Sequence, residues 1–271
     1  SIGPGDLGGH LAPAAFHGRL ERAAAAGGDG KRRKVVVVDC RNAREHAIGH
    51  FEGAVRPDVR SYAEFPKWVD EVLAPSLAAA ADGGGGDGAP PPEVLMYCTG
   101  GIRCEKSSAY VRRAVPGASV RHLAGGIHRY LEAYPDGGLW RGKNFVFDRR
   151  GGVPPGGAGG GDTVVGRCAY CDGPQDRFRP ADVCAACREP VLACPACRGA
   201  AAELHCPRHW DVRRCYYADL SGFTADQLAA QGAELERHMG GMAVGRKFKG
   251  RRGTLRRQLG RVRDRIAALA A

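Results

Sequence analysis

Long apolar segments and export signals are missing from this sequence. No apolar run approaches the roughly 18–20 residues that a membrane-spanning helix needs, and the Gly-rich start at Ser1 shows no signal-peptide pattern. We therefore predict neither membrane insertion nor export. The sequence also contains no recognisable P-loop, no flavin-binding or nicotinamide-binding loop, and no open metal site.

Acidic residues are scarce at the C-terminal end. The chain of 271 residues has 40 Lys and Arg against 29 Asp and Glu, a net charge of +11. Residues 241–271 contain ten basic side chains and one acidic side chain, Asp264, so this tail carries +9 and the remaining 240 residues only +2. A composition of 44% hydrophobic and 25% charged residues excludes a wholly disordered or fibrous chain and allows one or two domains.

The cysteines indicate metal binding rather than disulfides. There are eleven, an odd number, and most form C-x-x-C pairs within one short stretch. This pattern is typical of metal ligation in a reducing intracellular compartment, cytoplasmic or organellar (chloroplast or mitochondrion if a transit segment lies upstream).

Two Gly/Pro-rich runs divide the chain. We predict a disordered N-terminus over residues 1–10, an α/β domain over 11–150 with a flexible insert at 82–92, a linker over 151–163, a Cys-rich module over 164–215, and a helical basic tail over 216–271.

Strand and helix patterns alternate in the first half. Short apolar runs predict strands at Lys34–Asp39, Glu93–Cys98 and Ala118–Leu123. Helices are expected at Ala14–Ala26, Phe65–Ala80, Glu105–Val115 and Ile127–Ala133. The alternation predicts a parallel sheet flanked by helices, with functional groups at the carboxyl ends of the strands.

The loop after the second predicted strand favours an anionic group. Cys98 ends the strand, two glycines follow, and Arg103 precedes a helix, so backbone N–H groups and the helix dipole should stabilise a thiolate. Cysteine phosphatases have a C-x5-R loop, whereas this chain has C-x4-R. The smaller cradle favours a persulfide sulfur, with a phosphatase as a minor alternative and a buried structural cysteine as another.

Several segments resemble a known family. The run Asp39-Cys40-Arg41-Asn42 and the sequence GHFEGA at Gly49–Ala54 resemble the rhodanese fold. Met96–Tyr110, Pro57–Asp70, Leu123–Glu132 and Gly142–Arg150 are similar to the rhodanese-like family that includes the oxygen-dependent tRNA wobble-uridine hydroxylases and their eukaryotic rhodanese-domain (thiosulfate sulfurtransferase-like) relatives. Those hydroxylases carry a further domain ahead of the rhodanese domain, which this sequence does not include, and residues 82–92 are an insertion.

The resemblance implies roles for the loop. Cys98 would form the persulfide with a sulfane-sulfur donor, and the active loop would consist of Thr99, Gly100, Gly101, Ile102, Arg103 and Cys104. Arg103 would help to hold the anionic sulfur or its donor, and Cys104 would be a resolving thiol or a small residue that opens the helix. Asp39 and Arg41 are expected to form an ion pair that fixes the loops, with a catalytic role as the less favoured alternative. His50 and His122 are expected to be satisfied structural histidines unless either lies within reach of Cys98.

Four pairs at metal-ligand spacing follow in the second half. They are Cys168 and Cys171, Cys184 and Cys187, Cys194 and Cys197, and Cys206 and His209. Eight ligands predict two closed, structural zinc sites on which folding of the module depends. Sequential and cross-braced pairing are both compatible with the spacing. An iron–sulfur cluster and a redox or disulfide role remain as alternatives, and His209 favours zinc.

The tail predicts two helices. Thr224-x-x-Gln227 is a capping-box pattern for a helix to about Met239. Beyond it an apolar stripe of Leu255, Leu259, Val262, Ile266 and Leu269 runs among arginines. In the simplest interpretation the stripe packs on the rest of the chain or on a second copy. In a second interpretation the arginines of this helix contact RNA phosphates, and a helix on a membrane surface ranks third. The family favours tRNA, and the oligomeric state stays open.

Two classes of function compete at this point. The first is a sulfurtransferase-type enzyme linked to tRNA wobble-uridine hydroxylation. The alternative is a non-catalytic, zinc-containing module that binds RNA or a partner, with a rhodanese domain that carries or senses sulfur. Cys40 and Cys215 have no assigned role.

Overall fold

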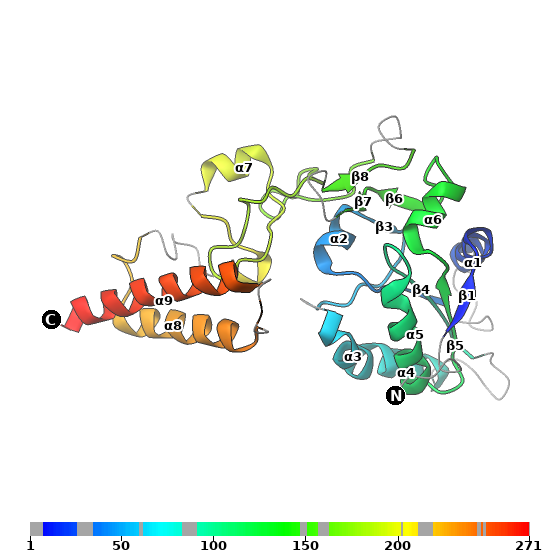
Figure 1. The fold of residues 1–271 in the computed structure, drawn as a ribbon, viewed down its shortest axis with the longest axis horizontal. Helices are drawn as coiled ribbons and strands as arrows, with labels where there is room; N and C mark the ends of the chain where they lie inside the picture. The colour runs from blue at the N-terminus through cyan, green and yellow to red at the C-terminus, as the bar shows by residue number, and fades with distance from the viewer. Residues whose placement is uncertain are drawn as a thin grey trace. The chain divides into compact units, whose positions relative to one another are not determined.

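The computed structural model describes residues 8–25, 35–59, 62–82, 91–146, 151–156, 163–201, 203–210, 219–242, 245 and 248–270. The chain divides into two compact units, Ser1–Gly166 and Arg167–Ala271 (Figure 1). The Cys-rich segment and the basic tail therefore belong to one unit. Cys215 and the tip of the 82–92 insert lie outside the described residues.

A four-stranded parallel sheet forms the centre of the first unit, in the order β1-β5-β4-β2. Its strands are β1 (Gly9–Leu11), β2 (Val35–Asp39), β4 (Glu93–Tyr97) and β5 (Ser119–Leu123). Every residue of β4 is buried, as its continuous apolar run predicts for a strand covered on both faces. The three predicted strands and the parallel sheet are confirmed.

Helices cover both faces of this sheet (Figure 1). Helices α1 (Pro13–Ala25) and α6 (Gly126–Ala133) pack on the face of Leu95 and Leu123. On the face of Val94 and Met96 lie α3 (Phe65–Trp68), a π-helical turn (Val69–Leu73), α4 (Ala74–Asp82) and α5 (Ile102–Ala114). The helix expected over 65–80 is therefore present, with a π turn in its middle.

The short elements have no counterpart in the sequence prediction. They are the 3-10 turn Tyr62–Glu64, α2 (Ala43–Ile48), β3 (Gly49–Phe51), β6 (Trp140–Gly142), β7 (Asn144–Phe145) and β8 (Gly152–Val153). Gly9 and His10, expected to be disordered, belong to β1, and Gly152 and Val153, expected in a linker, pair with β7. Elements of two to six residues are too short to show a periodic pattern.

A helical hairpin and a Cys-rich segment build the second unit. Its helices are α7 (Pro195–Ala200), the 3-10 turn Pro207–His209, α8 (Ala225–Gly240) and α9 (Lys249–Ala270). The capping box of α8 is confirmed, because the Gln227 N–H donates to Thr224 Oγ1 at 3.3 Å and the Thr224 N–H to Gln227 Oε1 at 3.0 Å. Helices α8 and α9 lie side by side (Figure 1).

The apolar stripe of α9 packs inside this unit. Leu255, Leu259 and Val262 are buried with Leu228 and Leu235 of α8, in a core that also includes residues of the Cys-rich segment. This confirms the alternative in which the stripe packs on the body; at its end, Leu269 stays 44% exposed.

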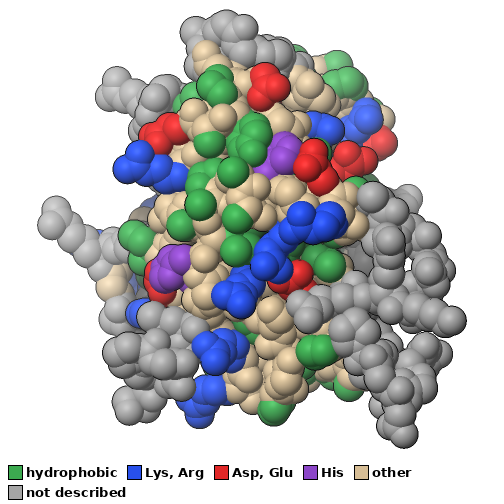
Figure 2. Space-filling view, turned by 90° about the vertical axis from the view of Figure 1, so that its right-hand side faces the viewer, with side chains coloured by type: hydrophobic (Ala, Val, Ile, Leu, Met, Phe, Trp, Pro, Cys, Tyr) green, Lys and Arg blue, Asp and Glu red, His purple; other side chains and the backbone are tan. Residues whose placement is uncertain are grey.

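Within the described ranges, no helix combines the length and the apolar character needed to cross a membrane. On the face drawn in Figure 2, basic and acidic side chains are interspersed.

Candidate active site and candidate metal centres

Cys98 lies in a cradle of backbone N–H groups at the carboxyl end of β4. The residue is 1% exposed, and the Gly101 N–H donates to its Sγ at 3.1 Å. Gly101 precedes α5 and has a φ of 89°, a conformation that favours glycine. Helix α5 begins directly after this glycine, three residues earlier than the sequence predicted. The start of α6 closes the loop from the other side, where the Ile127 N–H donates to the Cys98 carbonyl at 3.0 Å.

The surroundings of Cys98 favour its thiolate. The Cys104 S–H donates a hydrogen bond to the Cys98 sulfur, and this is the largest influence on its pKa. Burial opposes ionisation, whereas the charge of Arg103 and the N–H groups of Cys104 and Arg103 favour it. The pKa of Cys98 falls as a result from 9.0 to about 6. Burial, with the neighbouring Cys40 and Cys98 thiols, raises the pKa of Cys104 well above its usual value. Cys104 therefore stays protonated and acts as a donor, while Cys98 is mostly ionised at neutral pH.

Arg103 is held by a carboxylate that the sequence analysis did not select. Its guanidinium forms two hydrogen bonds of 2.8 Å with Glu45 and one of 3.2 Å with Thr99 Oγ1. Glu45 is fully buried and shares a capping box with Asn42 at the start of α2. The side chain expected to bind the sulfur is thus committed to Glu45 and reaches Cys98 through its charge. The spacing Asn42-x-x-Glu45 was the available sequence signal.

The remaining loop residues differ in exposure. Ile102 is 81% exposed, and Gly100 is exposed with no atom near the position of a Cβ. They lie at the mouth of the loop, whereas Cys104 is completely buried. The loop thus has an outer edge open to solvent and an inner wall of thiols.

A buried charge network supports the segment that carries Glu45. Arg41 Nε and Nη2 donate to the two carboxylate oxygens of Asp39 at 2.8 and 2.6 Å, and Tyr97 and His46 donate to Asp39 Oδ2 at 2.9 Å each. Burial raises the pKa of Asp39, but Arg41 and His46 outweigh it and hold that pKa well below its usual range. The expected Asp39–Arg41 ion pair is confirmed.

The two histidines expected to be satisfied differ. The Nδ1–H of His50 donates to the His46 carbonyl at 2.9 Å, and the two rings stack at 4.2 Å. His122 is buried, but neither ring nitrogen has a hydrogen-bond partner among the described residues. The prediction is confirmed for His50 and wrong for His122.

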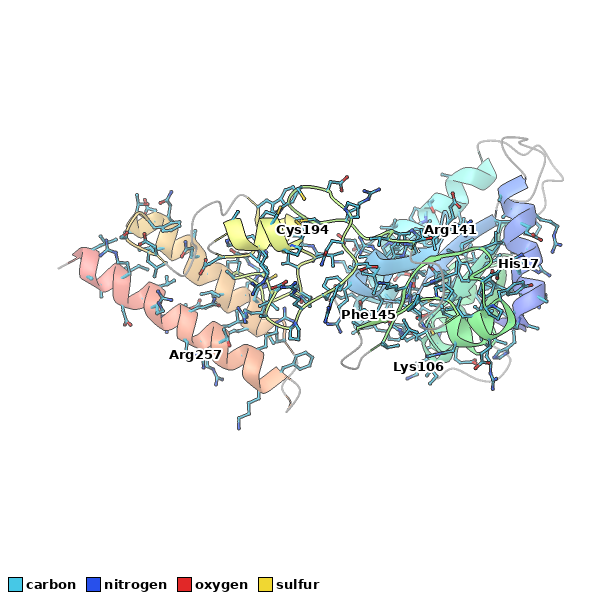
Figure 3. All side chains as sticks on the ribbon, turned by 90° about the horizontal axis from the view of Figure 1, so that it is seen from above. His17, Lys106, Arg141, Phe145, Cys194 and Arg257 are labelled. Atoms are coloured by element: carbon cyan, nitrogen blue, oxygen red, sulfur yellow. The ribbon has the colours of Figure 1, made fainter. Side chains whose placement is uncertain are left out.

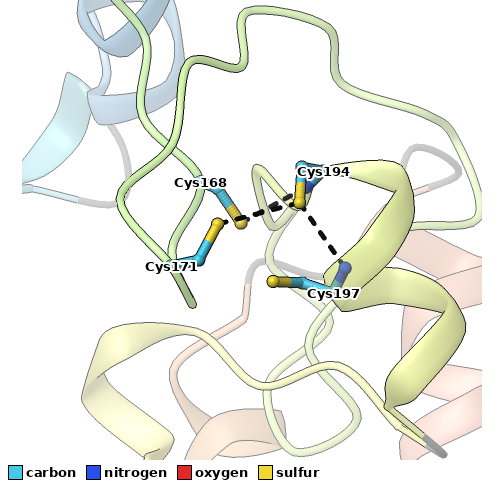
Figure 4. A group of neighbouring side chains, drawn as sticks. All are labelled: Cys168, Cys171, Cys194 and Cys197. Atoms are coloured by element: carbon cyan, nitrogen blue, oxygen red, sulfur yellow. Dashed lines mark hydrogen bonds between the residues drawn. The ribbon is translucent and has the colours of Figure 1, made fainter.

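The eight candidate metal ligands form two clusters with interleaved pairs. Cys168 and Cys171 join Cys194 and Cys197 (Figure 4), and Cys184 and Cys187 join Cys206 and His209. Of the two pairings compatible with the sequence, the structure therefore has the cross-braced one. In each cluster the ligand atoms lie within 4.8 Å of one another.

The distances in both clusters fit tetrahedral zinc. The Sγ–Sγ distance is 3.8 Å between Cys171 and Cys194 and also between Cys187 and Cys206. A Zn–S bond of about 2.3 Å implies a tetrahedron edge of about 3.8 Å. The sulfur ligands also receive backbone hydrogen bonds, such as Cys194 N–H to Cys168 Sγ at 3.3 Å.

The first two C-x-x-C pairs share one backbone turn. The Asp172 N–H donates to the Cys168 carbonyl at 2.9 Å, and the Arg188 N–H donates to the Cys184 carbonyl at 2.8 Å. Asp172 and Arg188 are the described non-glycine residues with positive φ, at 57° and 64°. The same hydrogen-bonded turn thus closes each pair, and both thiols of each pair belong to one cluster.

A carboxylate of α8 supports the second cluster. His209 points Nδ1 at the sulfurs, 3.1 Å from Cys206 Sγ, and its Nε2 lies 2.5 Å from Glu234 Oε1. A histidine ligand whose other nitrogen binds a carboxylate is a common arrangement around metals. Glu234 was not predicted, because the sequence gives no indication that α8 reaches the cluster.

Six of the eight described basic residues of the tail have a structural contact. Arg251 donates to the Cys187 carbonyl and to Glu189. Arg252 donates to one carbonyl in the last turn of α8 and to one just after the helix. Arg263 pairs with Glu236 at 2.7 Å. Arg246 and Lys247 lie outside the described residues. The exposed basic side chains of α9, on which Figure 3 labels Arg257, are Lys249, Arg256, Arg257, Arg261 and Arg263.

A parallel α/β sheet with a cysteine thiolate in an N–H cradle at the end of a central strand agrees with the rhodanese fold that the sequence resembles. The sequence matches the Rhodanese-like domain over residues 23–133 and the Rhodanase C-terminal family over residues 141–210. The chain therefore belongs to the rhodanese-like family, in the form that carries this C-terminal region. The resemblance noted from the sequence is confirmed.

Curated relatives include plant and bacterial proteins. The chain is 38% identical to Rhodanese-like domain-containing protein 6 of Arabidopsis thaliana, over 71% of this chain and 31% of that protein. It is 40% identical to the tRNA uridine(34) hydroxylase of Caulobacter vibrioides, over 67% and 55% of the two chains, and 35% identical to that of Jannaschia sp., over 88% and 66%. The chain thus spans between about a third and two thirds of these relatives.

Proposed function

We propose that Cys98 forms a persulfide and that the chain acts in hydroxylation of the wobble uridine, position 34, of tRNA. The observation that carries the proposal is the buried Cys98 thiolate, with a pKa of about 6, beside the Gly101 N–H. The bacterial relatives named tRNA uridine(34) hydroxylase support the choice of substrate. The Arg103–Glu45 pair argues against a phosphatase, because the guanidinium is already committed.

The persulfide step balances without an oxidant. The Cys98 thiolate attacks the outer sulfur of a sulfane-sulfur donor such as thiosulfate. The S–S bond of thiosulfate breaks, sulfite leaves with its electron pair, and Cys98 holds the terminal sulfur as a persulfide anion. The Gly101 N–H and the start of α5 lie where they can stabilise that anion.

Sulfur transfer from thiosulfate to cyanide tests this chemistry. We expect activity in the wild-type protein, loss of activity in Cys98→Ser, and one additional sulfur on the Cys98 peptide by mass spectrometry. Equal activity in both proteins would refute the persulfide assignment and favour the non-catalytic binding module.

The tRNA step needs a cellular readout. We expect tRNA from cells that lack the gene to lose hydroxylated uridine at position 34, and the wild-type gene to restore it. Restoration by Cys98→Ser would separate the modification from the persulfide.

We propose that both Cys-rich clusters bind Zn²⁺ in closed, structural sites. The 3.8 Å Sγ–Sγ distances and the His209–Glu234 contact support zinc. Elemental analysis should find two zinc ions per chain at these clusters, and a strong chelator should unfold the second unit, because its core surrounds Cys184 and Cys187. Iron with acid-labile sulfide would instead indicate an iron–sulfur cluster.

We propose that exposed arginines of α9 contact tRNA phosphates. Removing the whole tail would destroy the core that Leu255 and Val262 help to form, so the sharper variant is Arg256→Gln, Arg257→Gln and Arg261→Gln together. Each lost phosphate contact should reduce the slope of log affinity against log salt by about 0.7–0.9. The control replaces the exposed Arg112 and Arg113 of α5. An equal slope in all three proteins would refute the role of α9.

A further inference from the structure

Two histidines and one glutamate meet at an edge of the parallel sheet. His10 of β1 and His122 of β5 are direct partners in the strand register, and Glu105 lies in the first turn of α5. His10 Nε2 lies 2.8 Å from Glu105 Oε1, and His122 Nε2 lies 3.8 Å from Glu105 Oε2. The ring centroids of the two histidines are 4.2 Å apart. One ligand atom from each of the three residues lies within 4.8 Å of the other two.

His122 is the member that hydrogen bonding leaves unsatisfied. It is 1% exposed, and among the described residues neither of its ring nitrogens has a partner with hydrogen-bond geometry, although the backbone of Leu123 and Gly8 lies near the ring. A buried polar group without a partner destabilises the folded protein. Burial, followed by the charge of the neighbouring His10, lowers the pKa of His122, which favours the neutral ring. A cation beside Glu105 would satisfy this nitrogen.

The backbone around the cluster brings β1 close to α5. The Gly8 N–H donates to Ser108 Oγ at 2.9 Å, and a Cβ on Gly8 would lie only 2.6 Å from the Ser108 Cβ. This close approach needs a glycine, and it places His10 beside Glu105. The geometry is therefore set by packing rather than by a chance meeting of flexible side chains.

We propose that His10, Glu105 and His122 bind a divalent transition-metal ion, as a third metal site distinct from the Cys-rich clusters. Two histidines and one carboxylate are the ligand set of several catalytic zinc sites and of non-haem iron(II) sites, so Zn²⁺ and Fe²⁺ are the ions to test. His10 and Glu105 have side chains 53% and 37% exposed, which gives the ion a path of entry. Three protein ligands leave coordination positions open for water or a small molecule.

Metal binding to the full-length chain tests the site. With both Cys-rich clusters saturated with zinc, titration with Zn²⁺, or with Fe²⁺ under anaerobic conditions, should show one additional ion per chain. His10→Gln and Glu105→Gln each remove one ligand and should weaken that binding by at least about 100-fold, because loss of a supporting residue alone typically costs about 10–100-fold. His10 is half exposed, so His10→Gln should fold even if a variant of the buried His122 does not.

Two controls make the result decisive. His128→Gln removes an exposed imidazole of α6 and should leave the additional ion bound as in the wild type. Co²⁺ at the site should give visible bands without thiolate charge-transfer bands, because no sulfur is a ligand. The proposal is overturned if the wild type binds no additional ion, if His10→Gln and Glu105→Gln bind it as tightly, or if thiolate bands accompany it. These outcomes do not depend on Cys98 chemistry, so they are distinguishable from failure of the persulfide proposal.

Discussion

Replacing Cys104 tests how the protein activates Cys98. The Cys104 S–H is the largest single influence on the Cys98 thiol, ahead of burial and of the charge of Arg103. Cys104→Ala removes the donor and keeps the small size of the side chain. We therefore expect the pKa of Cys98 to rise, because the thiolate loses a hydrogen bond that stabilises its charge.

The expected shift can be estimated from hydrogen-bond energies. The fall of the Cys98 pKa from 9.0 to about 6 corresponds to about 4 kcal/mol at about 1.4 kcal/mol per unit. A hydrogen bond to a charged group contributes about 1.5–3 kcal/mol, and a thiol is a weak donor. The lower figure gives a rise of about one unit, so the thiolate fraction at pH 6 should fall from about one half to about one tenth.

Alkylation of Cys98 measured across pH is the suitable assay. A thiolate of higher pKa is also more nucleophilic, by about threefold per unit, so a rate at one pH would partly hide the effect. The midpoint of the pH profile does not suffer from this compensation. Mass spectrometry of the Cys98 peptide separates its reaction from that of the metal-cluster cysteines.

Cys104→Ser is the matched control. A serine hydroxyl still donates a hydrogen bond, so we expect a midpoint close to the wild-type value, whereas a resolving thiol would be lost equally in the serine and alanine variants. If Cys104→Ala has the wild-type midpoint, or if Ser and Ala shift it equally, the donor explanation is wrong.

Three further predictions concern stability and metal affinity. Asp39→Asn should lower the free energy of unfolding by about 3–5 kcal/mol in urea titration, because it leaves the buried arginine partner without its counter-charge. Since the pKa of Asp39 is depressed in the fold, this stabilisation is present above about pH 4 and is lost as the pH falls further. The variant should lack that acid sensitivity. Gly126→Ala should destabilise the protein more than Gly117→Ala in the same titration. Both glycines have positive φ, but a Cβ at Gly126 would lie 2.4 Å from a backbone oxygen, whereas no atom lies near a Cβ at Gly117. Equal losses of unfolding free energy would contradict the close packing of α6 on the active loop. Glu234→Gln should weaken zinc binding at the second cluster by about 10–100-fold in chelator competition, whereas Glu236→Gln, which removes a surface ion pair, should not.

Local sequence patterns are sufficient to predict several elements of this protein. The β-branched run at Val35–Val38 predicts a buried strand, and the glycines after Cys98 predict an N–H cradle. The capping box at Thr224 predicts the start of α8. In each case the residues that act together lie within a few positions, so backbone geometry alone brings them into contact.

Tertiary structure decided which distant residues meet. Sequential and cross-braced clusters have the same C-x-x-C spacing, and only the folded chain brings Cys168 next to Cys194. Glu45 holds Arg103 from 58 residues away. His10 reaches His122 only because a three-residue strand, too short for any periodic signal, pairs with β5. Local propensity encodes each element, but strand pairing and core packing set the distances between elements. The three groups of distant residues named here therefore follow from the fold.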